Sequence, residues 1–318
     1  MEEASAEEEP PGGTPLLRVR NVELSLRLRK FFVKFEGANP TGTQKDRISA
    51  KHISNAIENG YNTVSLGSCG NYGASIAHYA RLFGLKTVVG VPSGYAGDRN
   101  DEIRAMGGTV IGIDGTYERS LEIVGDMARD NNWYDCSPGS VNSGIDLEGY
   151  GTIADEIIAQ LGHSPEIVAV PVGNGTTLSG IYKGFNRAYQ SGRIDGIPRI
   201  VAASTPGGNP IVESWKNGYR TIRSLDPDQL VETRNNEPLI SYRSTDGQGA
   251  LSAIYQSHGF AEYVTDDEML YYARLIEEAE GISTLPASAS ALVAASRVLV
   301  RMGEEMECVV VLTGRGRT

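Results

Sequence analysis

The sequence predicts an α/β protein with mainly parallel sheets, and three observations support this class. Apolar strand-like runs alternate with amphipathic helical runs along the chain. Glycine-rich loops follow three of the strand-like runs, and ligands of parallel sheets bind at such strand ends. The length of 318 residues is enough for one large domain or two ordinary ones.

The expected elements follow from the hydrophobic pattern. The candidate strands share short runs of apolar and β-branched residues: Phe31–Phe35, Thr63–Leu66, Thr87–Val91, Thr109–Ile113, Ile167–Val172, Arg199–Ala203 and Cys308–Leu312. The candidate helices share apolar residues at helical spacing: Asp46–Glu58, Ala74–Phe83, Ser120–Arg129, Gly151–Leu161, Leu178–Tyr189, Asp266–Glu278 and Ala287–Met302.

Composition and charge exclude several functional classes. Hydrophobic residues make up 40% of the chain, and no apolar run approaches the roughly 18 residues of a membrane span. The net charge of −11 disfavours nucleic acid as a partner, because phosphate binding needs basic surface. The segment Met1 to Gly13 is acidic, rich in Pro and Gly, and unlike a signal peptide. We therefore expect a disordered tail at residues 1–13 of a cytoplasmic protein.

The cysteines give no sign of a metal site. Cys69, Cys136 and Cys308 are isolated, without the spacing of metal ligands. Isolated thiols are typical of reduced cysteines in a cytosolic protein. The sequence therefore predicts neither a metal nor a disulfide.

The first candidate site is the segment Asn39-Pro40-Thr41-Gly42-Thr43-Gln44-Lys45-Asp46-Arg47. Pro40 and Gly42 favour a turn after a strand, and Asp46 suits the first turn of a helix. Lys45 is thereby held near backbone at the junction. A lysine amine forms an imine with an aldehyde cofactor once it is unprotonated, which desolvation promotes. The same position also suits a solvated lysine at a helix start.

The second candidate site is the loop Gly173-Asn174-Gly175-Thr176-Thr177 between a strand and a helix. Glycines let backbone N–H groups converge, threonines add hydroxyl donors, and the helix N-terminus favours an anion. The loop lacks the lysine of a nucleotide-binding P-loop, so it suits a simple phosphate, although it also suits a plain tight turn. At the end of the last strand Thr313 places a neutral hydroxyl where it can meet a ring nitrogen.

Together these segments resemble the fold-type-II enzymes that use pyridoxal 5′-phosphate (PLP), the family of tryptophan synthase β, and threonine synthase in particular. The matching motifs occur in the family's order and cover nearly the whole chain after the tail: GGTPL at Gly12–Leu16, KFEGANPTGTQKDR at Lys34–Arg47, SCGNYGAS at Ser68–Ser75, VPVGNGTTLSGIYKGF at Val170–Phe185, EGISTLPASASAL at Glu280–Leu292 and VVVLTGRG at Val309–Gly316.

The resemblance implies an architecture and a cofactor. We expect two three-layer α/β/α domains with PLP in the cleft between them. Residues 14–45 and 151–318 would form the larger, PLP-binding domain, and residues 46–150 a smaller, mobile substrate domain. The resemblance further implies a homodimer that acts on a small amino acid.

The resemblance also implies roles for individual residues. Lys45 would hold PLP as a Schiff base and move the proton, Asn71 would contact the 3′-oxygen of the pyridine ring, and Thr313 would face its nitrogen. The cofactor phosphate would be held by Gly173, Asn174, Gly175, Thr176 and Thr177. The expected substrate contacts are Ser68, Cys69, Tyr72, Asn142, Ser143 and Asp146.

One departure from threonine synthase concerns the substrate phosphate. In the stretch Ser140–Gly151, Asp146 stands where the family has an arginine, and Gly151 where it has a lysine. A carboxylate beside a dianionic phosphate is repulsive, and the best anchor of that phosphate is lost. Alternatively, Asp146 is a solvated loop residue and other groups hold the phosphate.

The leading interpretation is therefore a PLP-dependent carbon–oxygen lyase that resembles threonine synthase, converting O-phosphohomoserine and water to threonine and phosphate by γ-elimination and β-addition. The alternatives are a β-replacement enzyme similar to cysteine or cysteate synthase, and a serine/threonine dehydratase. A regulatory homologue without catalysis is disfavoured because Lys45 and all three cofactor loops are present.

Overall fold

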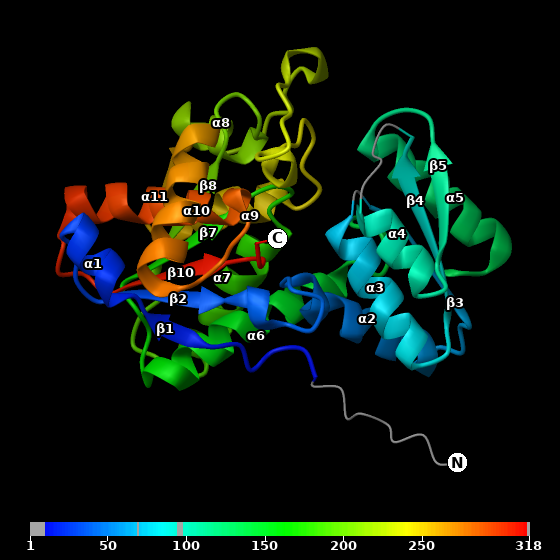
Figure 1. Ribbon diagram of the computed structural model, residues 1–318, viewed down its shortest axis with the longest axis horizontal. Coiled ribbons are helices and arrows are strands. Elements are labelled where there is room, and N and C mark those ends of the chain that lie inside the picture. The colour runs from blue at the N-terminus through cyan, green and yellow to red at the C-terminus, as the bar shows by residue number, and fades with distance from the viewer. Residues whose placement is uncertain (1–9, 69, 94–97, 317–318) are drawn as a thin grey trace.

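The computed structural model describes residues 10–68, 70–93 and 98–316, and the predicted substrate contact Cys69 lies outside them. Within this part of the chain, six strands form the larger sheet in the order β1-β2-β10-β7-β8-β9 (Figure 1). β1 pairs antiparallel with β2, and all other neighbours are parallel. The strands are β1 (Leu16–Arg18), β2 (Phe31–Phe35), β7 (Ile167–Pro171), β8 (Arg199–Ser204), β9 (Phe260–Tyr263) and β10 (Cys308–Leu312).

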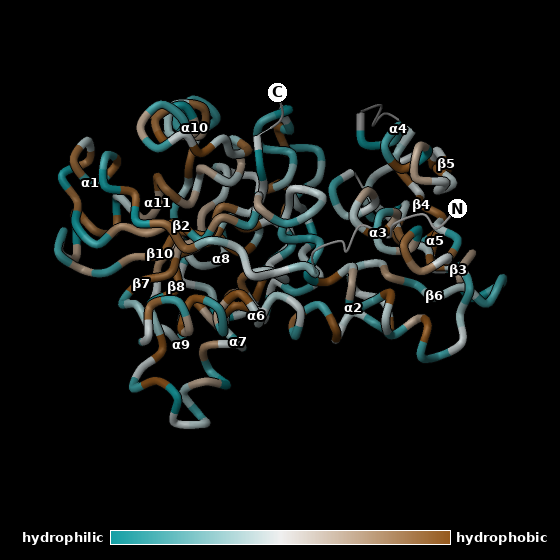
Figure 2. Tube along the Cα trace, turned by 60° about the horizontal axis from the view of Figure 1, so that its bottom comes forward, coloured by the Kyte–Doolittle hydropathy of each residue, from teal (hydrophilic) through white to brown (hydrophobic). Residues whose placement is uncertain are grey.

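Helices cover both faces of this sheet. Alternate residues of β7 point to opposite faces, so Val168 and Val170 belong to one apolar core and Ile167 and Ala169 to another. The central strands are accordingly hydrophobic along their whole length (Figure 2). The first core contains α6 (Gly144–Leu161), α7 (Thr176–Gln190), α8 (Pro210–Lys216) and α9 (Gly247–Gln256), and the second α1 (Arg20–Leu26), α10 (Asp266–Glu280) and α11 (Pro286–Met302).

The smaller sheet has the order β5-β4-β3-β6 and is parallel throughout. Its strands are β3 (Thr63–Gly67), β4 (Lys86–Pro92), β5 (Thr109–Ile113) and β6 (Tyr134–Asp135). The helices of this half are α2 (Lys45–Glu58), α3 (Asn71–Leu82), α4 (Asp98–Ala105) and α5 (Tyr117–Asn131). α5 packs closely over one face, because a Cβ at Gly90 would lie 2.4 Å from Val124. The predicted fold class, two layered α/β units with mainly parallel sheets, is confirmed.

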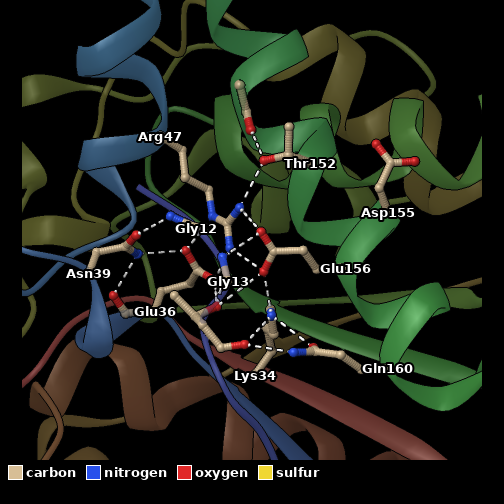
Figure 3. Close-up of polar contacts among 12 residues, drawn as sticks. Gly12, Gly13, Lys34, Glu36, Asn39, Arg47, Thr152, Asp155, Glu156 and Gln160 are labelled. Carbon is tan, nitrogen blue, oxygen red and sulfur yellow. Dashed lines mark hydrogen bonds and ion pairs between the residues drawn. The ribbon is translucent and has the colours of Figure 1, made fainter. Parts of the chain in front are cut away.

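A buried ion network joins the larger sheet to α2 and α6 (Figure 3). Arg47 binds Glu36 at 2.6 Å through Nε and Glu156 at 2.7 Å through a terminal nitrogen. Lys34, on β2, lies 2.6 Å from Glu156 and is fully buried. Two cations thus face two carboxylates, and such pairing offsets the cost of taking charges out of water. The network anchors α2 two residues after Lys45.

The same network contacts Gly12 and Gly13, the last residues of the predicted tail, and the disorder of the tail stays a prediction. Gly12 N–H donates to Asn39 Oδ1 at 2.9 Å, and Gly13 N–H donates to Glu156 Oε1 at 3.0 Å. These two glycines, expected in a disordered tail, are therefore held in place because the network offers them acceptors. Residues 1–9 lie outside the described chain.

Two further observations concern the helices. α6 is continuous from Gly144 to Leu161, so the expected domain boundary between residues 150 and 151 falls inside a helix. The division into domains stays a prediction. No helix in the described residues is long and apolar enough to cross a membrane.

Candidate active site

A cavity of about 580 Å³ opens between the two sheets. It lies beyond the carboxyl ends of β3, β7 and β10, where parallel α/β folds bind ligands. The predicted site residues that line it come from both halves of the molecule: Lys45, Ser68, Asn71, Tyr72, Asp146, Gly173, Asn174, Gly175, Thr176, Thr177 and Thr313.

Lys45 is the first residue of α2, and its half-buried side chain lines the cavity. Its Nζ lies 5.2 Å from the ring centroid of Tyr72 and 5.7 Å from that of Tyr150. Burial lowers the pKa of Lys45, and Asp146 and Asp246 oppose this shift only in part. The arrangement favours the neutral amine that imine formation requires.

The backbone before Lys45 is held by the loop after β10. Gln44 N–H donates to Thr313 O at 3.0 Å, and Arg315 N–H donates to Gly42 O at 2.9 Å. Gly42 has a φ of +84°, which glycine adopts without strain. Two of the predicted segments, far apart in sequence, therefore lie side by side and fix where Lys45 begins its helix.

The loop from Gly173 to Thr177 has the form expected of an anion cup. α7 begins at Thr176, and Gly175 before it has a φ of +88°. A Cβ at Gly173 would stand 2.6 Å from Pro238 O, so only glycine fits there. The Thr176 hydroxyl donates to Asp246 Oδ2 at 2.6 Å. The cup can offer an anion the backbone N–H groups at the start of α7 as hydrogen-bond donors.

Thr313 is paired with a second hydroxyl that the sequence analysis missed. Thr313 Oγ1 and Ser288 Oγ lie 2.7 Å apart, and both residues line the cavity. Ser288 is in the first turn of α11, in the quoted motif EGISTLPASASAL. A hydroxyl pair can donate to or accept from a ring nitrogen without placing a charge beside it.

Asn71 and Ser68 lie at the start of α3. Asn71 Oδ1 accepts from Arg99 Nε at 3.0 Å, whereas the role expected for Asn71 uses Nδ2, the other end of the amide. Ser68 Oγ accepts the N–H groups of Gly70 and Gly73, which fixes the loop around the helix start. This helix N-terminus suits the carboxylate of an amino acid.

Tyr72 and Arg99 complete this side of the cavity. The Tyr72 hydroxyl donates to Cys136 O at 2.9 Å, so its ring, rather than its hydroxyl, faces Lys45. Arg99 lines the cavity from α4, a helix that was not predicted because its sequence is almost entirely polar. No motif in the sequence pointed to this arginine.

Asp146 is buried in the cavity wall, with a relative exposure of 1%. Its Oδ1 lies 2.8 Å from His52 Nε2, and His52 Nδ1 lies 3.2 Å from the Tyr134 hydroxyl. Since that hydroxyl accepts from Asn55, it is free to donate to Nδ1, which leaves the Nε2 proton for Asp146. Asp146 is therefore not a solvated loop residue, and the burial contradicts that alternative.

Asn142 and Ser143 are used within their own loop. Asn142 Nδ2 donates to Asp135 O at 2.9 Å, and Ser143 Oγ donates to Ser140 O at 2.9 Å. Neither is among the described residues that line the cavity. Their role as substrate contacts stays a prediction.

The cavity residues fit a PLP molecule. The buried amine of Lys45, the glycine cup at the start of α7 and the hydroxyl pair at Thr313 match the aldehyde, phosphate and ring nitrogen of the cofactor in chemistry. A metal would need several acidic or imidazole ligands together, and the described residues hold no group of three His, Cys, Asp or Glu suited to it.

Comparison with known proteins agrees with this reading of the cavity. The family model "Pyridoxal-phosphate dependent enzyme" matches residues 8–314. Threonine synthase of Methanocaldococcus jannaschii is 35% identical over 96% of this chain and 75% of the relative. Threonine synthase of Methanosarcina acetivorans is 36% identical over 92% of this chain and 71% of the relative.

Solved structures share the fold at lower identity. Processed threonine deaminase isoform 2 from Solanum lycopersicum has a TM-score of 0.78 at 18% identity, over 96% of this chain and 84% of that one. Maize serine racemase has the same TM-score and identity, over 96% and 90%. The family match and the identity to threonine synthases together establish that the chain belongs to the fold-type-II pyridoxal-phosphate dependent enzymes and is related to threonine synthase.

Proposed function

We propose that this protein is a PLP-dependent carbon–oxygen lyase that removes a leaving group from an amino acid whose distal end carries no dianionic phosphate. The observation that carries the proposal is Asp146, a buried carboxylate in the cavity wall. Glu118, Glu232 and Glu237 also line the cavity. These four carboxylates outnumber the two cations, Lys45 and Arg99, among the described lining residues, which disfavours a second phosphate beside that of the cofactor.

The roles of the chain's own residues follow from their positions. PLP supplies an electron sink when it is bound. Lys45 Nζ, whose pKa is lowered by burial, would take the proton from the substrate Cα and return it later. The N-terminus of α3 with Ser68 would hold the substrate carboxylate. Ser288 and Thr313 would leave the ring nitrogen without a charged partner, which favours elimination over transamination.

A second candidate is threonine synthase itself, acting on O-phosphohomoserine by γ-elimination and β-addition. Arg99 supports it, because a guanidinium in the cavity wall can bind a phosphate in the absence of the expected arginine at position 146. The two threonine synthases compared above, at 35% and 36% identity, point the same way. β-Replacement and serine/threonine dehydration are both consistent with the first proposal, because each removes a leaving group from an amino acid without a distal phosphate. A cytoplasmic homodimer, implied by the family resemblance, is our proposal for the working form.

Two substitutions separate the candidates. Asp146→Asn keeps an acceptor for His52 and removes the charge, and Arg99→Gln removes the cation. Steady-state turnover of O-phosphohomoserine, homoserine and O-acetylserine would be measured for both variants and the parent. Under the first proposal Asp146→Asn raises kcat/KM for O-phosphohomoserine by about five-fold to a thousand-fold, the range for a charge pair about 4 Å apart as the effective dielectric falls from 80 to 20.

The outcomes exclude one another. High activity of the parent on O-phosphohomoserine that is lost in Arg99→Gln and insensitive to Asp146→Asn would refute the first proposal and support threonine synthase. Turnover of O-acetylserine by the parent, with gain on O-phosphohomoserine only in Asp146→Asn, would support the first proposal. Release of a keto acid and ammonia from serine or threonine, added to the same panel, would identify a dehydratase, whereas an amino-acid product from O-acetylserine only when a thiol is supplied would identify β-replacement.

A further inference from the structure

Tyr150 is a buried residue to which the proposed reaction assigns no task. Its side chain is fully buried on α6 and lines the cavity. Its hydroxyl has no partner at hydrogen-bonding distance and angle within the described chain. The Thr177 side chain lowers its pKa as a hydrogen-bond donor does, which leaves the phenol proton without an acceptor. Of the described residues that line the cavity, Tyr150 is the one with such an unpaired buried side-chain atom. Because an unpaired buried hydroxyl is destabilising, the arrangement indicates a partner that arrives with a ligand.

The packing of α6 on α7 gives the direction of this side chain. Leu147 O lies near Gly180, and Gly151 O near Gly184, so the two helices run parallel. Tyr150 Cβ lies 2.6 Å from the point where a Cβ at Gly180 would stand. Helical side chains tilt toward the helix N-terminus. From Gly180, that direction on the parallel α7 leads back along one turn to Thr177 and Thr176, the last residues of the cup and the first of α7.

The electrostatics identify Tyr150 as a donor. Burial raises the pKa of Tyr150 well above its ordinary value, Asp146 raises it further, and hydrogen bonding from the Thr177 side chain to the phenol oxygen opposes the shift only in part. The phenol therefore stays protonated, and its O–H needs an acceptor. An anion in the cup is the acceptor that the geometry offers.

We propose that the Tyr150 hydroxyl donates a hydrogen bond to the phosphate of PLP, and so forms part of the cofactor site. The proposal rests on the phosphate lying in the cup between Gly173 and Thr177, but not on the identity of the amino-acid substrate. The ring of Tyr150 meanwhile forms one wall beside Lys45, and the substitution that tests the hydroxyl leaves this wall in place.

The test compares two forms of the cofactor on Tyr150→Phe apoenzyme. The full chain is titrated with PLP and with pyridoxal, which has the same ring and aldehyde and no phosphate. We expect the Kd for PLP to rise about ten-fold or more, as for the loss of one hydrogen bond to a charged group, and the Kd for pyridoxal to stay unchanged. Tyr72→Phe is the matched control, because that ring also faces Lys45 while its hydroxyl is committed to Cys136 O. It should not change the ratio of the two Kd values.

The remaining outcomes overturn the proposal. Equal weakening of PLP and pyridoxal would mean that Tyr150 acts on the ring or on the fold. Unchanged binding of both would mean that its hydroxyl serves something other than the phosphate. The ³¹P resonance of bound PLP is a second measurement, and it should shift in Tyr150→Phe and not in Tyr72→Phe. Since no amino acid is present, failure of the proposed lyase activity would leave these results unaffected.

Discussion

Burial and two carboxylates, Asp146 and Asp246, shift the pKa of Lys45 in opposite directions. The reactivity of this lysine should therefore depend on pH. Burial lowers the pKa of Lys45, whereas Asp146 raises it. The rate of PLP uptake by apoenzyme should therefore rise with pH and level off below the ordinary range of a lysine. Asp146→Asn removes an influence that favours the charged amine, so its midpoint should move to lower pH. Stopped-flow absorbance over a series of pH values measures both, and a midpoint that moves upward would contradict the assignment.

The covalent role of Lys45 has its own test. Borohydride reduction of the PLP-loaded protein should fix the label on the peptide that contains Lys45. Lys45→Ala should lose at least the factor of about 10²–10⁴ that a positioned proton-transfer group contributes. Mass spectrometry of the digest and steady-state assays measure these outcomes. Lys34 is a buried lysine outside the cavity lining, and a label on it instead of Lys45 would refute the role.

Individual residues also show what the sequence could not predict. Lys45 and the cup were predicted from local composition, since each lies in or directly after a glycine-containing loop that follows a strand, whereas the roles of Asn71 and Thr313 came from the family resemblance. Tyr150 and Arg99 were missed because their roles depend on contacts with residues that are far away in the sequence. Arg99 in particular lies among charged residues that are typical of any exposed helix.

Among the elements, the start of α7 depends most on the identity of a single residue, Gly175. A side chain at Gly175 would need a φ of +88° and would place its Cβ 2.8 Å from Ile211. Gly175→Leu should weaken PLP binding by about 3–6 kcal/mol if two hydrogen bonds to the phosphate are lost. Titration of apoenzyme with PLP measures this.

The control for that variant is Gly218→Leu. Gly218 has a φ of +73° and open space around it, so the substitution strains the backbone without crowding the cup. It should lower stability and leave PLP affinity unchanged. Equal affinity of both variants for PLP would place the phosphate elsewhere.

The elements differ in how far their sequence predicts them. β2, β5 and β10 have the bounds that were predicted. β10 is a buried parallel strand, which is a short, continuous apolar run, whereas β5 is an edge strand recognised by its β-branched residues. α6 begins seven residues before its predicted start, because Gly144, Gly149 and Gly151 lower helix propensity. Tertiary packing supplies the reason for Gly149, because a Cβ there would lie 2.8 Å from Ile48 and 3.1 Å from Arg47 O.

For the molecule as a whole, the ion network around Arg47 links stability to pH. Burial raises the pKa of Glu156, but Arg47 and Lys34 outweigh this and hold it at about 2. A carboxylate with a lowered pKa stabilises the fold above its unfolded pKa, and that contribution is lost as pH falls toward about 2. The free energy of unfolding should therefore fall between about pH 5 and 2 more steeply in the parent than in Glu156→Gln.

Urea unfolding at a series of pH values measures this difference. Glu305→Gln is the control, because Glu305 pairs with Arg29 on the surface, where both side chains are 69% exposed. Such a pair contributes little, so this variant should follow the parent. A parent and Glu156→Gln with the same acid dependence would show that the network does not link stability to pH.

Helix α6 performs two tasks at two places along its length. Asp146 and Tyr150 line the cavity in its first two turns, whereas Glu156 and Gln160 hold the network further on. Asp146 and Glu156 are about 15 Å apart along the axis at the rise of an α-helix, beyond the distance within which substitutions usually influence one another. During evolution, the residues of α6 that select the substrate can therefore change without weakening the ion network that holds the two halves of the molecule together. Natural selection can act on the two traits separately, although one helix carries both.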